Sequence, residues 1–252
     1  MRKILALFGG LLFVGPASQA SDMSTWQSIF NGKDLTGWTV KFTGSEIGQD
    51  TDKVFRVEDG MLRVSYDPTG SFSGQFGHLF YHQKLSHYRL RFQYRFTGEQ
   101  LTGGPAWAWR NSGVMVHSQA VDTMTIDQDF PVSIESQLLG GPDEGDRPTG
   151  NVCSPGTHIT VDGEFITQHC VNSSSETFRG DQWVNFEVEV RGGDVIRHYV
   201  NGKQVLELRD PVYDSLGAGQ GYRSVMDGHI ALQAESHNVD FRNIQLMILP
   251  VK

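Results

Sequence analysis

Apolar and polar residues alternate with a period of two along several short segments, and no long helical periodicity appears. In residues 88–96, YRLRFQYRF, aromatic residues and leucine alternate with arginine and glutamine, and residues 184–192 repeat this pattern. Successive side chains of a strand point to opposite faces, so these segments predict antiparallel strands with one buried and one solvated face. Residues 228–236 and 239–249 add two late strands.

Turn residues separate these segments at fairly even spacing. Asn201-Gly202 lies between two apolar runs, and Asp59-Gly60 has the same setting; both dipeptides favour tight hairpins. Many short strands without helices predict an all-β sandwich or barrel. No linker-like break occurs between residues 26 and 250, so one domain is expected over residues 21–252. Residues 140–180 are rich in proline and glycine and are expected to be irregular, either as a functional loop or as a surface excursion.

The first twenty residues have the features of a secretory signal peptide. Arg2 and Lys3 precede an apolar stretch that is too short to span a bilayer, and Ser18 and Ala20 fit the small-residue cleavage pattern. We therefore expect export to the periplasm or the cell exterior, with cleavage after Ala20. No later stretch is apolar for long enough to predict a membrane span.

Charge and cysteine content refine this expectation. The formal net charge is −8, and the loss of Arg2 and Lys3 would take it to −10, which argues against nucleic-acid partners. Cys153 and Cys170 are the only two cysteines, and in an oxidising compartment they are expected to form a disulfide. Two free or metal-binding thiols are the alternative.

Several segments, in this order, resemble the 3-keto-disaccharide hydrolase family: IFNGKDLTGW (29–38), NSGVMVH (111–117), IESQLLGG (134–141), QWVNFEVEVRGGDVIRHYVNGKQV (182–205) and GHIALQAESHNVDFRNIQL (228–246). The resemblance implies a concanavalin A-like jelly roll of two antiparallel sheets, with a sugar site on the concave one. It also implies cleavage of glycosides that are already oxidised to a ketone at C3. Other members of the family imply glycosidase or binding roles.

The segment IESQLL places a carboxylate and an amide, Glu135 and Gln137, on one face of a predicted strand. A Glu paired with a neighbouring arginine is the alternative to a site. Retaining glycosidases need two carboxyl groups, and laminarinase-like enzymes of this fold carry both on one strand. This strand has only one, because Gly140 stands where the second is expected. Laminarinase chemistry is therefore rejected.

A 3-keto sugar requires different groups. The ketone acidifies the hydrogen on C2, so one base can start elimination, and a donor or cation near the ketone oxygen stabilises the enolate. Glu135 or His117 is the candidate base. His117 departs from the Arg that the family resemblance suggests at this position, and a structural role is its alternative. Arg110 is the candidate for polarising the ketone, and a salt bridge to an acidic neighbour is its alternative.

Other residues are expected to bind substrate or a metal. Trp107 and Trp109 would share one face if their segment were extended, which suits a sugar platform. Asn111 belongs to the Asn-Ser-Gly turn, and Gln233 and Glu235 share a strand face. Glu235 could supply a second carboxylate, which keeps hydrolysis of an unoxidised glycoside open. No cofactor is firmly expected; a divalent metal remains open, with Glu135, His117 and Glu235 as the first ligands to examine.

Three classes of function remain, the third being an extracellular adhesion or scaffold domain. The first is an exported enzyme that cleaves a glycosidic bond of a small carbohydrate, in particular a 3-keto-disaccharide, by elimination and hydration. The second is a non-catalytic, lectin-like module, because a fold by itself does not imply activity.

Overall fold

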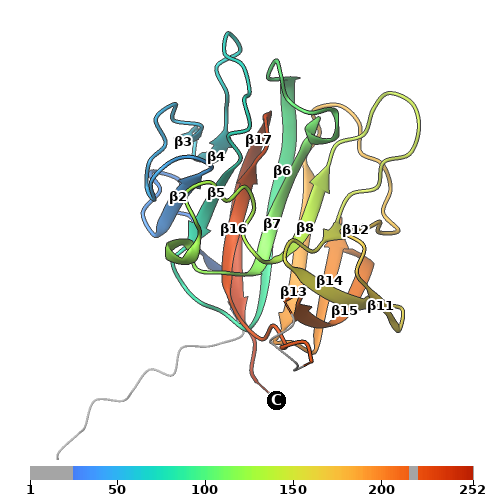
Figure 1. Cartoon of the computed structure of the whole chain (residues 1–252). Coiled ribbons are helices and arrows are strands. Elements are labelled where there is room, and N and C mark those ends of the chain that lie inside the picture. The colour runs from blue at the N-terminus through green and yellow to red at the C-terminus, as the bar shows by residue number, and fades with distance from the viewer. Residues whose placement is uncertain (1–24, 216–220, 252) are drawn as a thin grey trace, which may run out of the picture.

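Two antiparallel β-sheets pack face to face in the computed structural model, which describes residues 25–215 and 221–251 (Figure 1). Every pairing between named strands is antiparallel. The structure confirms the predicted all-β, concanavalin A-like jelly-roll sandwich. The predicted signal peptide, residues 1–20, lies outside the described residues.

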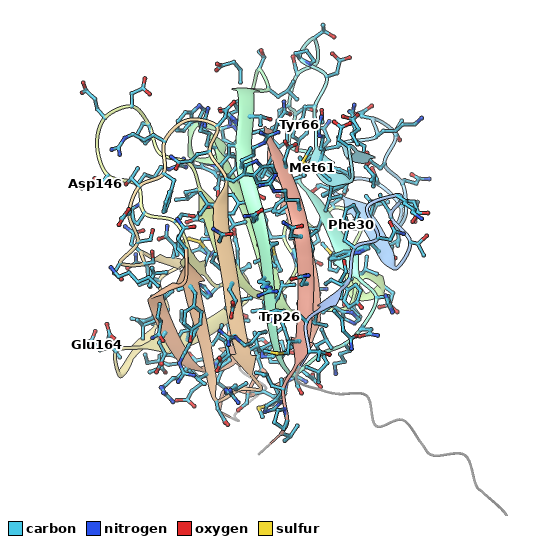
Figure 2. The ribbon with its side chains drawn as sticks, turned by 180° about the vertical axis from the view of Figure 1, so that it is seen from behind. Trp26, Phe30, Met61, Tyr66, Asp146 and Glu164 are labelled. Atoms are coloured by element: carbon cyan, nitrogen blue, oxygen red, sulfur yellow. A yellow bond between two sulfur atoms is a disulfide. The ribbon has the colours of Figure 1, made fainter. Side chains whose placement is uncertain are left out.

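The larger sheet has ten strands, with β6 and β17 side by side near its middle (Figure 2). Its order is β11-β10-β15-β14-β13-β6-β17-β4-β3, and β1 pairs with β17. The strand bounds are β1 Gln27–Ser28, β3 Phe55–Glu58, β4 Met61–Val64, β6 His87–Gln100, β10 Thr157–Val161, β11 Glu164–Ile166, β13 Val184–Arg191, β14 Val195–Val200, β15 Lys203–Tyr213 and β17 His237–Ile248.

The smaller sheet has seven strands in the order β12-β9-β8-β7-β16-β5-β2 and faces the viewer in Figure 1. Its strands are β2 Trp38–Phe42, β5 Gly77–Tyr81, β7 Asn111–Ser118, β8 Ile134–Leu139, β9 Asn151–Cys153, β12 Cys170–Val171 and β16 His229–Ala234. Two short 3₁₀ turns, η1 Ala106–Ala108 and η2 Val121–Thr123, flank β7. None of the helices among the described residues has the length and apolar character that crossing a bilayer requires.

The core lies between the sheets and follows the alternation of the sequence. The five apolar side chains of residues 88–96 are at most 3 % exposed. The intervening arginines lie on the outer face, where Arg95 pairs with Asp240 and Arg91 stacks over the Trp26 ring. On the opposing sheet, Val114 and Val116 face the core as predicted. One face of each sheet is thus committed to the core, and the concave face of the smaller sheet is left for polar groups.

Both predicted hairpins form. Asp59 and Gly60 have φ values of 52° and 74° between β3 and β4, and Asn201 and Gly202 have 47° and 81° between β14 and β15. Positive φ at both central residues matches the right-handed twist of the flanking strands. These local turns set the registers β3–β4 and β14–β15.

The stretch from 140 to 180 is more regular than its composition predicted. It contains strands β9 to β12, because short apolar runs find partners at the edges of both sheets. The Cys153–Cys170 disulfide forms as predicted and joins β9 to β12, across 17 positions of sequence. It fixes the edge of the smaller sheet.

Replacing both cysteines with alanine is expected to lower the free energy of unfolding by about 3 kcal/mol, because the cross-link restricts a loop of roughly this length in the unfolded chain. Denaturant melts of the oxidised protein and the double variant measure the difference. The single variant Cys170→Ala should match the double variant. A loss below about 0.5 kcal/mol, set against this loop-entropy expectation, would contradict the prediction.

Candidate functional site

A cavity of about 370 Å³ lies over the concave face of the smaller sheet. Strands β7, β8, β9 and β12 and the end of β16 contribute to it. Its lining combines two carboxyl groups, two amides, two aromatic rings, the disulfide and a histidine: Trp107, Asn111, Phe130, Glu135, Gln137, Cys153, Pro155, His169, Cys170 and Glu235. This mixture of a few polar groups with apolar walls is typical of small-molecule sites.

Strand β8 directs Glu135 into the cavity. Ile134 and Leu138 are buried in the core between the sheets, so Glu135 and Gln137 take the opposite, concave face. Gly113 lies beside them on β7, and a Cβ at this position would be 2.5 Å from Glu135 Oε1. The absence of a side chain at Gly113 therefore leaves the space that the Glu135 carboxyl occupies.

Glu235 reaches the same cavity from the end of β16. The next residue, Ser236, has a φ of 74°, and its backbone N–H donates to the Tyr66 hydroxyl at 2.9 Å. Gln100 Nε2 donates to the Ser236 hydroxyl at 2.9 Å. These two hydrogen bonds hold the turn that aims Glu235 inward, where its side chain is 3 % exposed.

Burial raises the pKa values of both carboxyl groups, and for Glu235 the charge of its neighbour adds to the rise. Burial raises the pKa of Glu135 to about 8. Burial, and then the charge of Glu135, raise the pKa of Glu235 well above its ordinary value, while the Arg147 guanidinium opposes this shift. No ion pair to Glu135 forms among residues 25–215 and 221–251. A pair of this kind retains a proton at neutral pH, so it can both donate and accept protons.

Two amides complete the polar lining. Asn151 Nδ2 donates to Gln137 Oε1 at 3.1 Å, so the amino group is the part of the Gln137 amide that can donate to a ligand. Asn111 Nδ2 donates to the Trp107 carbonyl at 3.3 Å, and Asn111 Oδ1 is buried and has no partner among the described residues. The cavity therefore offers a hydrogen-bond donor and an acceptor beside the two carboxyl groups.

The two tryptophans are separated because their segment is the 3₁₀ turn η1, not an extended strand. Trp107 is 52 % exposed and lines the cavity, stacked on Phe76 at 5.7 Å. Phe76 in turn contacts Phe130 at 4.8 Å. Trp109 points elsewhere and packs against His237 at 6.1 Å. Only Trp107 is placed to contact a ligand in this cavity.

Arg147 is a residue of the site that the sequence reasoning missed. Its Nη1 donates to the carbonyls of Trp109 at 2.7 Å and Gly140 at 2.8 Å, and its Nη2 donates to the Trp107 carbonyl at 3.3 Å. It thus holds η1 in place and brings a positive charge toward Glu235. Phe130 and His169 were also missed. All three lie in loops without a motif, so no sequence signal marked them.

Arg110 and His117 are not brought to the cavity. Arg110 Nη2 pairs with Asp181 at 2.9 Å, which is the salt bridge kept open as its alternative. His117 is 2 % exposed, and its Nε2 donates to the Gly192 carbonyl at 2.9 Å. The φ of His117 is 51°, so the strand alternation ends at this residue and its ring leaves the concave face. Gln233, predicted to bind substrate, is fully buried and does not line the cavity.

The residues proposed as metal ligands do not come together in the described residues. In the part of the chain that the structure describes, the group of potential ligands that comes together is Cys153, His169 and Cys170. Both sulfurs are joined to each other, so His169 remains alone. Glu135 and Glu235 share the cavity, but His117 lies outside it, and the suggested trio of ligands is not assembled.

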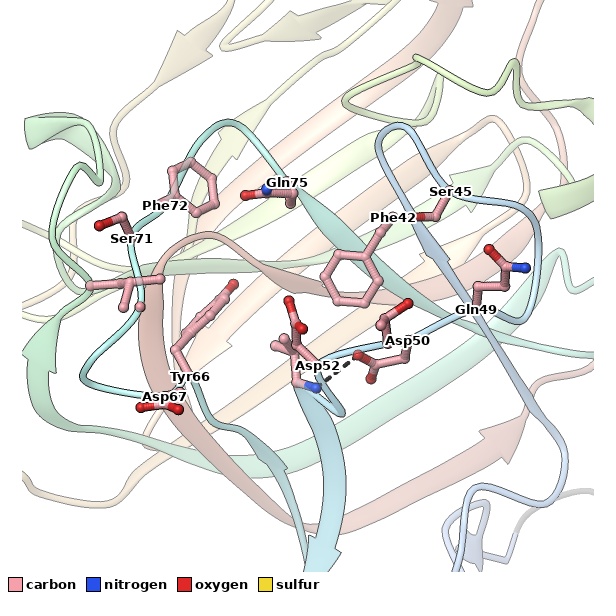
Figure 3. A pocket seen from close by; sticks show the side chains of 14 residues that line it. Phe42, Ser45, Gln49, Asp50, Asp52, Tyr66, Asp67, Ser71, Phe72 and Gln75 are labelled. Carbon is pink, nitrogen blue, oxygen red and sulfur yellow. Dashed lines mark hydrogen bonds between the residues drawn. The ribbon is translucent and has the colours of Figure 1, made fainter.

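A second cavity, of about 330 Å³, lies against β2 and contains three aspartates (Figure 3). Asp50 accepts the backbone N–H groups of Val54 and Phe55, each at 2.8 Å. Asp67 accepts the Thr69 N–H at 2.9 Å. Because Asp50 and Asp67 are used to hold loops, we place the candidate site in the first cavity.

Comparison with known proteins agrees with this architecture. No curated protein matches the chain. Two crystal structures from Parabacteroides distasonis ATCC 8503, each described as a "putative glycosyl hydrolase", share its fold. The first has 16 % identity and a TM-score of 0.53 and covers 89 % of this chain and all of its own. The second has 19 % identity and a TM-score of 0.52 and covers 89 % of this chain and 94 % of its own.

The family comparison extends over nearly all of the described sandwich. Residues 25–247 match the model of the 3-keto-alpha-glucoside-1,2-lyase-like domain. The matched range includes both carboxyl groups of the cavity, the disulfide and the Asn-Ser-Gly segment, which was expected to be a turn but forms the start of strand β7. The resemblance inferred from the sequence motifs is confirmed, and the chain belongs to the family of 3-keto-alpha-glucoside-1,2-lyase-like domains.

Proposed function

We propose that this protein is an exported carbohydrate-active enzyme that cleaves the glycosidic bond of a 3-keto-glycoside, such as a 3-keto-disaccharide, by elimination and hydration. The observation that carries the proposal is the meeting of Glu135 and Glu235, from two strands far apart in sequence, in one buried cavity. Raised pKa values place such groups near the pH range where a carboxyl group serves as acid and base.

The proposed reaction divides the work between the two carboxyl groups. The Glu135 carboxylate takes the proton from C2, and the electron pair of that bond forms the enolate of the C3 ketone. The enolate then expels the substituent at C1 as an alcohol, which takes its proton from the Glu235 carboxyl. Water adds to C1 of the resulting enone, gives a proton to the Glu235 carboxylate, and C2 regains its proton from Glu135. The sum is hydrolysis without a covalent sugar–enzyme intermediate.

Neighbouring groups support these steps. The Gln137 amino group takes the role first expected of Arg110, donating a hydrogen bond to the enolate oxygen. Asn111 Oδ1 accepts a hydrogen bond from a sugar hydroxyl, and the exposed face of Trp107 packs against the ring. Arg147 positions η1 and limits the rise of the pKa of Glu235.

Hydrolysis of an unoxidised glycoside is the second candidate, because Glu235 supplies the second carboxyl group that β8 lacks. The purified protein should be incubated with a 3-keto-disaccharide and with its unoxidised parent, with and without a chelator. We expect release of monosaccharide from the ketone alone, unaffected by the chelator. Cleavage of the parent would favour the second candidate. Binding without cleavage of either sugar would favour a lectin-like module.

Export is a separate proposal. It rests on the predicted signal peptide, residues 1–20, and is supported by the Cys153–Cys170 disulfide, because such bonds persist in oxidising compartments. N-terminal sequencing of protein from the culture medium and periplasm should find Ser21 first. An intact Met1 in a cytoplasmic fraction would contradict it.

His117 is expected to stabilise the fold without taking part in the reaction. Asparagine tolerates positive φ, so His117→Asn should lose mainly the hydrogen bond to Gly192. We expect the free energy of unfolding to fall by about 1–2 kcal/mol, and kcat/KM for the 3-keto-disaccharide to stay within about twofold. A tenfold fall in kcat/KM at unchanged stability would instead show that His117 acts in the reaction.

A further inference from the structure

Buried polar side chains form a row beneath the cavity, across the concave face of the smaller sheet. Strand pairing places His78 beside Gln233. The register between β16 and β7 ends at the pair Leu232 and Val114, and its continuation by one residue brings Gln233 beside Gly113. The Glu135 carboxyl occupies the space over Gly113. The row therefore runs from His78 through Gln233 to Glu135.

Two members of this row have unused hydrogen-bonding groups. His78 and Gln233 are both 0 % exposed. Neither ring nitrogen of His78 and neither amide atom of Gln233 has a partner within the described residues. Such groups cost stability when buried, and native proteins almost always satisfy them. Lys41, at the far end of the row, is not a hydrogen-bond partner of these side chains, because its Nζ donates to the carbonyls of Phe42 and Ile126.

One aromatic side chain contacts both the cavity and the His78 end of this row. Phe130 lines the cavity, is half-buried, and packs edge-on against His78 with ring centroids 6.1 Å apart. Phe130 contacts Phe76, on which Trp107 stacks. Phe130 therefore lies between His78 and the cavity.

We propose that His78 and Gln233 form a subsite next to Glu135 that hydrogen-bonds hydroxyl groups of an uncharged sugar when the Phe130 ring turns aside. This inference rests on the proposed function and specifies its substrate class. Each side chain offers one donor side and one acceptor side, which matches a hydroxyl group that donates and accepts. A buried setting beside two acidic groups, with Lys41 already tied to two carbonyls, disfavours sugars that carry a carboxylate.

Burial supports this assignment by keeping the imidazole neutral. It lowers the pKa of His78 to about 3, with a further contribution from the charge of Lys41. A neutral ring cannot balance an anionic group. The titratable and charged groups that face the row are thus Lys41, which is tied to two carbonyls, and the two cavity carboxyl groups.

The test compares two equally buried histidines. In His78→Phe the ring shape is kept and the hydrogen-bonding groups are removed. The matched control is His198→Phe, because His198 is also 0 % exposed but its Nε2 bonds to Ser136 Oγ at 2.8 Å and its Nδ1 to the Gly150 carbonyl at 2.9 Å. Dissociation constants for 3-ketoglucose, glucose and glucuronate are measured by NMR titration, and stability by denaturant melts.

We expect His78→Phe to weaken binding of 3-ketoglucose at least tenfold while its unfolding midpoint is unchanged or higher. His198→Phe should lower the midpoint and leave binding within twofold. Glucuronate should bind the wild type at least tenfold more weakly than the neutral sugars. Three results would overturn the subsite. They are unchanged binding in His78→Phe, a loss of binding together with stability in that variant, and a wild type that binds neither neutral sugar. If binding depends on His78 but the 3-keto-disaccharide is not cleaved, the subsite stands and the proposed enzymatic function fails.

Discussion

Replacing Glu135 with glutamine is expected to lower kcat/KM for the 3-keto-disaccharide by about 10²- to 10⁴-fold, the range that a positioned general base contributes. Glutamine keeps the size of the side chain over Gly113 but cannot accept the proton from C2. Most of the loss should appear in kcat, because the side chain acts on the transferring proton more than on the bound sugar. Initial rates of monosaccharide release measure it.

A second glutamate provides the control for this prediction. Glu189 is also largely buried, but it lies on the outer face of the larger sheet and pairs with Arg191 and Arg197. Glu189→Gln should change stability and leave kcat/KM within about twofold. Equal rates for Glu135→Gln and the wild type would place the base elsewhere, even if the 3-keto-disaccharide is the substrate.

The second large effect concerns stability and pH. Burial raises the pKa of Glu135 from an ordinary 4.5 to about 8, so the folded chain holds a proton that the unfolded chain has already released. This contribution to stability is fully present below about pH 4.5 and is lost as the pH rises toward 8. At about 1.4 kcal/mol per pKa unit, the wild type should lose roughly 3–5 kcal/mol more than Glu135→Gln between pH 5 and pH 8.

Denaturant melts of both proteins at several pH values measure this difference. Subtracting the two curves removes the contribution of the buried histidines, which the proteins share. The lowered pKa values of His78 and His198 act in the opposite direction, costing stability as the pH falls below about 6.5. Parallel curves for the two proteins would show that the Glu135 carboxyl is not perturbed in the folded state.

Much of the fold follows from local patterns. Alternation in residues 88–96 predicted which side chains enter the core, and the two glycine-containing turns predicted hairpins that form with positive φ. These features depend on the two-residue period of a strand and on turn sterics, which neighbouring residues decide among themselves. The strands of residues 140–180 were missed because edge pairing with distant segments supports them.

The candidate site was predictable only in part. The pairing of Glu135 with Gln137 on one face followed from β8 alone. Two predictions that assumed an extended strand were wrong. A positive φ turns His117 toward Gly192, and the 3₁₀ turn η1 directs Trp109 away from Trp107. Arg147 had no local signal, because its role is to hold carbonyl groups of a segment about forty residues earlier in the sequence.

The sequence by itself determined the strand faces, the hairpins, the disulfide partners and the family, since these depend on short-range periodicity, the presence of only two cysteines, and motifs. The tertiary structure decided that Glu135 and Glu235, one hundred positions apart, meet in one cavity while His117 and Arg110 do not. The reason is physical: β7 lies between β8 and β16, and its Gly113 leaves room for a carboxyl group. That arrangement depends on the order of the strands in the sheet and on the burial of the two carboxyl groups in the folded protein. Neither property can be read from one segment of the sequence.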